Sequence, residues 1–168
     1  MKFIVVLLLL IMISCTEIGS NYKHNFKDQE LQGKIGGKEW VSKNGKASLT
    51  QRDSTTTWSF QFSDLRDENA PCSFSSYDIG KVMFSTKNID PGVKKLKMSF
   101  NLSKAQTITM VYDQDSAKGP MNKIALEGAF EITEFDTVNK NIIKGRMDIY
   151  SDDDNFVNGN FEATFCKN

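Results

Sequence analysis

The sequence predicts an all-β domain, an antiparallel meander of about seven to nine strands that closes as a small barrel or folds into a two-sheet sandwich. Three observations lead to this prediction. Apolar and polar residues alternate along most of the chain, the segments between the alternating runs are short and rich in turn residues, and no stretch after the first 14 residues shows a helical period. Alternation with a period of two is typical of strands that have one buried and one solvated face.

Each alternating run places its apolar side chains on one face, which we expect to face the core. In the longest run, Gly128 takes one of these inward positions, so we expect a bend or a bulge there. The inward sets are Trp58, Phe60 and Phe62; Leu96, Met98 and Phe100; Ile108, Met110 and Tyr112; Ile124, Leu126, Phe130 and Ile132; Ile143, Gly145, Met147 and Ile149; and Val157, Gly159, Phe161, Ala163 and Phe165.

Turn residues separate these runs. Gly36 and Gly37, placed between Ile35 and Trp40, predict a small hairpin at the start of the domain. The segment from Ser73 to Ile79 is undecided and could hold a short helical turn. Polar turns are expected at 88–92, 136–141 and 151–155.

The N-terminal segment has the features of a bacterial export signal. Lys2 supplies a positive charge, Phe3–Ile13 is an unbroken apolar stretch, and Ser14 is a small residue beside a cleavage position. The apolar stretch is shorter than the roughly 20 residues that a transmembrane helix needs. The sequence Met12-Ile13-Ser14-Cys15 resembles the lipobox of bacterial lipoproteins, with Met12 where that family usually has leucine.

This resemblance implies cleavage before Cys15, acylation of that cysteine, and attachment to a membrane through the lipid. The expected division is a signal peptide over 1–14, a lipidated cysteine and flexible tether over 15–32, and a single β-domain over 33–168. Thr16, rather than aspartate, follows the cysteine and favours the outer membrane of the cell envelope. The alternative is an ordinary secretory signal that is cut elsewhere, with Cys15 incidental.

Two cysteines remain once Cys15 is assigned to the lipid. Cys72 and Cys166 form an even pair in an exported and oxidising compartment. We expect a disulfide between them, which would close a loop of about 94 residues and connect the last strand to a loop near the middle of the chain. The alternative is a pair of buried free thiols.

The composition argues against several classes of function. Lysine plus arginine number 21 and aspartate plus glutamate also 21, so the chain lacks the basic excess that nucleic-acid binding needs. Its single histidine, His24, lies in the expected tether, which excludes histidine-based triads and histidine-rich zinc sites from the domain. We therefore expect no catalytic residues, no cofactor and no metal, and the chain is not expected to be an enzyme.

Three residue groups can be compared with known sites. The turn Asp152-Asp153-Asp154-Asn155 is rich in oxygen ligands of the kind that calcium prefers, but its spacing does not fit an EF-hand and favours a solvated hairpin turn, as does Asp113-Gln114-Asp115-Ser116. Aromatic residues could line a ligand cavity, as in lipocalins, or simply fill the core. These aromatic residues are Trp40, Trp58, Phe60, Phe62 and Tyr112.

The opening segment 33–40 and the closing segment 157–165 resemble segments of small all-β lipoproteins of Bacteroidetes-type bacteria. That group has no general assigned activity, so the resemblance implies a location and a fold. We expect a lipid-anchored cell-envelope protein whose non-catalytic β-domain binds or scaffolds a partner of unknown identity. The alternatives are a lipocalin-like carrier of a small apolar ligand and an inhibitor of a host hydrolase.

Overall fold

A computed structural model describes residues 23–52, 54–65, 72–73, 80–97, 105–113 and 119–167. Within these ranges the chain forms eleven strands and no helix, which confirms the all-β class. Accordingly, no helix capable of spanning a membrane occurs in these ranges. The strands are β1 (Gln32–Ile35), β2 (Lys38–Val41), β3 (Asn44–Arg52), β4 (Thr55–Ser63), β5 (Lys81–Thr86), β6 (Lys94–Lys95), β7 (Ile108–Asp113), β8 (Pro120–Ile124), β9 (Glu127–Asp136), β10 (Ile142–Asp152) and β11 (Asn155–Cys166).

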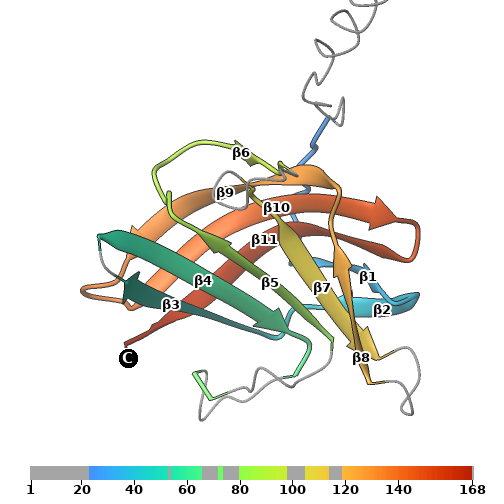
Figure 1. The fold of residues 1–168 in the computed structure, drawn as a ribbon, viewed down its shortest axis with the longest axis horizontal. Helices are drawn as coiled ribbons and strands as arrows, with labels where there is room; N and C mark the ends of the chain where they lie inside the picture. Colours follow the sequence, from blue (N-terminus) through green and yellow to red (C-terminus); the bar gives the residue numbers. More distant parts are fainter. Residues whose placement is uncertain are drawn as a thin grey trace, which may run out of the picture.

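Nine of the strands form a sheet that curls into a half-barrel, in the order β6-β9-β10-β11-β3-β4-β5-β7-β8 (Figure 1). The β1–β2 hairpin lies off this path and pairs with β11 through β1. Neighbouring strands are antiparallel except for β11 and β3, which run parallel. The sheet therefore consists of two antiparallel parts, β3-β4-β5-β7-β8 and β6-β9-β10-β11, which we call the first and second meanders and which meet at the parallel pair of β3 and β11.

The opening hairpin is confirmed. Gly36 and Gly37 connect β1 to β2, and both have positive φ angles, of 61° and 74°. Two such residues in succession are what a tight hairpin turn requires, and glycine adopts this conformation without steric cost.

The expected strand from Ile124 to Thr133 is interrupted. Ala125 and Leu126 separate β8 from β9, which lie near opposite ends of the sheet order. The N–H of Ala125 donates to the Ile108 carbonyl at 2.8 Å and that of Leu126 to the Tyr150 carbonyl at 3.1 Å, so the link joins β7 to β10. Ala125 is buried, whereas Ile124 and Leu126 are 41% and 54% exposed. The prediction that Ile124 and Leu126 point into the core is wrong, because the alternation does not continue through this link.

The bulge in β9 is not at Gly128. The register with β10 shifts between Lys144 and Gly145, which makes Thr133 the extra residue. Gly128 has a φ of 133°, and a Cβ there would lie 2.2 Å from the Asp148 carbonyl oxygen. Glycine is needed at this position because the two backbones approach closely.

Phenylalanine rings fill the concave side of the sheet. The ring centroids of Phe60 and Phe84 lie 4.7 Å apart, as do those of Phe84 and Phe130, and those of Phe62 and Phe161 lie 4.9 Å apart. Aromatic pairs at such separations add to the stabilisation that burial of the rings provides. The core is thus formed by inward side chains of both meanders.

Two expectations fall partly outside the described ranges. Leu96 packs against the core as expected, but Met98 and Phe100 are not described. Of the undecided segment from Ser73 to Ile79, only Ser73 is described.

Candidate functional site

Cys72 and Cys166 form the expected disulfide. Their Cα atoms lie 5.7 Å apart, and the bond links residues separated by 94 positions. Cys166 ends β11 opposite Ser48 of β3, and Cys72 belongs to the connection between β4 and β5. The disulfide therefore links the end of β11 covalently to the connection between β4 and β5.

The segment expected to be a flexible tether is described from Lys23 onward, and its course differs from that expectation. We call residues 23–31 the strap. Residues 25–28 lie against outward side chains of β10 and β11, and residues 29–31 run beside β11 and form backbone hydrogen bonds with Asn160. The polar composition of the strap suggested a solvated tether, but its backbone groups find partners on the sheet. Cys15 lies outside the described residues.

The strap packs against two neighbouring cross-strand residue pairs of β10 and β11. Arg146 is opposite Asn160, and Asp148 is opposite Asn158. Met147, between the two β10 residues, is buried in the core, so alternation places all four side chains on the outer face. We call these four residues the platform, and each of them contacts the strap.

Asp148 and Asn158 bind the backbone of the strap. The Asn25 N–H donates to Asp148 Oδ2 at 2.7 Å. The Lys27 N–H donates to Asn158 Oδ1 at 2.9 Å, while Asn158 Nδ2 donates to the Asn25 carbonyl oxygen at 3.0 Å. One asparagine amide thus satisfies a donor and an acceptor on the two sides of Phe26, and none of these bonds involves a strap side chain.

Arg146 supplies a contact with a strap side chain. Its guanidinium carbon lies 4.7 Å from the centroid of the Phe26 ring, a cation–π contact of about 0.5–1 kcal/mol at an exposed position. Glu131 of β9 holds the guanidinium through its Nε and Nη2 atoms, each at 2.7 Å. The His24 ring packs against the other aromatic ring of the strap, Phe26, with centroids 5.2 Å apart.

Asn160 fixes the end of the strap. Its Nδ2 donates to Asp28 Oδ1 at 2.9 Å, and its backbone N–H donates to the Gln29 carbonyl at 2.7 Å. The Leu31 N–H donates to the Asn160 carbonyl at 2.9 Å, and the Leu31 side chain is buried in the core. The strap therefore begins on the outer face and ends inside the domain.

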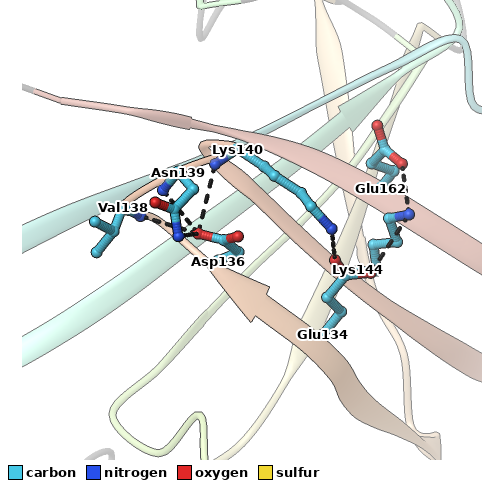
Figure 2. A network of polar contacts seen from close by, with 7 residues as sticks. All are labelled: Glu134, Asp136, Val138, Asn139, Lys140, Lys144 and Glu162. Atoms are coloured by element: carbon cyan, nitrogen blue, oxygen red, sulfur yellow. Dashed lines mark hydrogen bonds and ion pairs between the residues drawn. The ribbon is translucent and has the colours of Figure 1, made fainter.

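A network of charged residues continues on β9 to β11 beyond the platform (Figure 2). Lys144 lies between Glu134, at 3.4 Å, and Glu162, at 3.5 Å, and Lys140 pairs with Glu134 at 3.0 Å. The two lysines, Lys140 above all, lower the pKa of Glu134. Asp136 accepts backbone N–H groups of the β9–β10 turn, which lowers its pKa. These pairs are exposed and stabilise the fold only weakly.

The acidic turn is part of the β10–β11 hairpin. Asp152 pairs with Lys123 at 2.6 Å and accepts from Asn155 Nδ2 at 2.7 Å. The Tyr150 hydroxyl donates to Asp153 at 3.0 Å, and the Gly36 N–H donates to Asn155 Oδ1 at 2.9 Å. In the described part of the chain, no group of three histidine, cysteine, aspartate or glutamate residues could hold a metal ion. Asp152 and Asn155 are paired across the turn between β10 and β11, which agrees with the hairpin interpretation.

The aromatic residues considered as cavity lining belong to the core. Trp40, Trp58, Phe60 and Phe62 are buried, and Tyr112 packs against them at the edge of the cluster. The Trp40 indole N–H donates to the Gly80 carbonyl at 2.5 Å, which satisfies its polar atom. Of the other acidic stretch, Asp113-Gln114-Asp115-Ser116, only Asp113 is described.

No protein-family model, curated protein or solved structure matches this chain. The platform itself was not predicted from the sequence. One signal was available, because Asn158 and Asn160 occupy alternate positions of a strand, where asparagine is depleted. All four platform residues contact one segment outside the strands, so we take the platform as the candidate functional site.

Proposed function

We propose that this chain is a lipid-anchored protein of the bacterial cell envelope whose non-catalytic β-domain binds or scaffolds a partner, and that it resides at the outer membrane. The observation that carries the proposal is the Cys72–Cys166 disulfide. Disulfides form and persist in exported compartments and are rare in the cytosol. The disulfide and the export-type leader support the same location.

The strap adds a spatial argument to this proposal. If the lipid is on Cys15, only residues 16–22 separate it from the strap, so the Cα atoms of Cys15 and Lys23 are at most about 28 Å apart. The strap is attached to the sheet from Asn25 onward. The domain would thus be held close to the lipid surface, with β10 and β11 carrying the connection, as suits a protein that presents a binding surface at a membrane.

The experiment compares the full chain with Cys15→Ala in its bacterial host. The mature N-terminal peptide should carry a diacyl or triacyl mass on Cys15, and the Cys15→Ala variant should leave the membrane fraction. The matched control is Cys72→Ala/Cys166→Ala, which removes the other two cysteines and should remain with the membranes. A mature chain that starts elsewhere, or full membrane partitioning of Cys15→Ala, would refute the lipid anchor.

A further inference from the structure

We propose that the platform is a binding site for the backbone of an extended peptide segment of a partner protein, and that the strap occupies this site from within the same chain. The proposal rests on the proposed function, in that it names the class of partner that the β-domain binds. Its basis is the geometry of the four platform residues around the strap.

Recognition of the strap is directed mainly at its backbone. Asp148 accepts one N–H, and the Asn158 amide pairs with a carbonyl and with the N–H two residues later. An extended chain of almost any sequence offers these groups, and proline alone lacks the N–H. Backbone pairing of this kind is how extended peptides gain affinity in known peptide-binding domains.

Two further contacts define a preferred sequence. Arg146, fixed by Glu131, presents its guanidinium to an aromatic ring between the two paired backbone positions. Asn160 Nδ2 donates to a side-chain oxygen two residues after that ring, which Asp28 provides in the strap. The site therefore fits an extended segment with an aromatic residue followed, two positions later, by aspartate or asparagine.

The structure allows residues 23–28 of the strap to leave the platform without opening the core. The side chains of Asn25, Lys27 and Asp28 are exposed, and that of Phe26 is only partly buried. The first fully buried apolar side chain is that of Leu31. The platform residues belong to the continuous pairing of β10 with β11, which does not include the strap, so the site stays formed when the strap is released.

The first measurement tests whether the backbone holds the strap. Asn25→Pro/Lys27→Pro removes the two N–H donors, and Asn25→Ala/Lys27→Ala keeps them while removing the same side chains. Both are made in the full chain, extracted from whole cells in detergent. Hydrogen exchange of the remaining strap amides should accelerate at least tenfold in the proline variant and stay at the parent rate in the alanine variant. Equal acceleration in both variants would refute backbone recognition.

The second measurement tests binding of a separate peptide. The probe is a fluorescent peptide with the sequence of residues 23–32, and fluorescence anisotropy measures its affinity. The proline variant should bind it at least tenfold more tightly than the parent or the alanine variant, because its own strap no longer competes. Adding Asn158→Ala to the proline variant, or replacing the phenylalanine of the peptide by alanine, should reduce this binding.

Three results would overturn the proposal. One is a proline variant with a released strap that does not bind the peptide, and another is binding that survives Asn158→Ala. The third is a dimer, detected by light scattering, whose formation requires Asn158, since this would assign the platform to a second copy of the chain. None of these measurements depends on acylation of Cys15, so failure here is distinguishable from failure of the lipid anchor.

Discussion

Removal of the disulfide is expected to cost the domain a large part of its stability. The double substitution Cys72→Ala/Cys166→Ala opens a loop that spans 94 positions. The chain-entropy model assigns about 4.7 kcal/mol at 25 °C to a closed loop of this length. Cys72 is exposed and Cys166 only half-buried, so the substitutions remove little packed surface. Engineered bonds often contribute less than the model gives, and we expect a loss of about 3–5 kcal/mol.

Urea unfolding measures this loss. Trp40 and Trp58 are both buried and should report the transition by fluorescence, with the free energy taken from linear extrapolation. The control is Val138→Ala, because Val138 is 82% exposed and its truncation should change stability by less than about 0.5 kcal/mol. A loss below about 1 kcal/mol in the double variant, with an unchanged slope, would refute the loop-closure argument.

Two other predictions concern single residues. A Cβ at Gly145 would lie 2.3 Å from both the Phe161 ring and the Glu131 carbonyl oxygen. Gly145→Ala should therefore lower the free energy of unfolding by about 2–3 kcal/mol. A change under about 0.5 kcal/mol in urea unfolding would contradict this close packing. Hydrogen bonds from Lys123, the larger cause, and from Asn155 lower the pKa of Asp152. The stability that the Lys123–Asp152 pair provides is therefore present at a pH above the ordinary carboxyl pKa, and it is lost as the pH falls through the lowered pKa. Lys123→Ala should raise the Asp152 titration midpoint measured by carboxyl NMR, and an unchanged midpoint would show that the ion pair does not form in solution.

The sequence predicted the strands whose alternation of large apolar and polar residues is clear, and it missed those whose alternation is weak. Phe60 and Phe62 made β4 recognisable. In β3 the buried residues are only Gly45 and Ala47. In β5 Val82 and Phe84 are buried in the core, but the neighbouring Lys81 is buried as well, which obscures the alternation. Side-chain pattern alone does not separate such strands from polar connections.

The platform was missed for a different reason. Outward polar residues such as Asn158 and Asn160 have the same pattern whether they face water or another segment. The strap shows no periodicity because backbone hydrogen bonds hold it, and such bonds leave no trace in the order of side chains. The pairing of Cys72 with Cys166 was predictable because the lipobox resemblance assigns Cys15 to the lipid, which leaves only these two cysteines to pair.

The parallel pairing of β11 with β3 has a consequence for the order in which the chain folds. Most pairings within the two meanders join strands that are close in the sequence and need only local loop closure, whereas Thr164 must find Lys46 across most of the domain. A chain that is synthesised from its N-terminus presents β3 long before β11 arrives. Until then the edge of β3 that will receive β11 is open to strands of other molecules. We therefore expect the period between the emergence of β3 and that of β11 to be when the chain is most prone to aggregate.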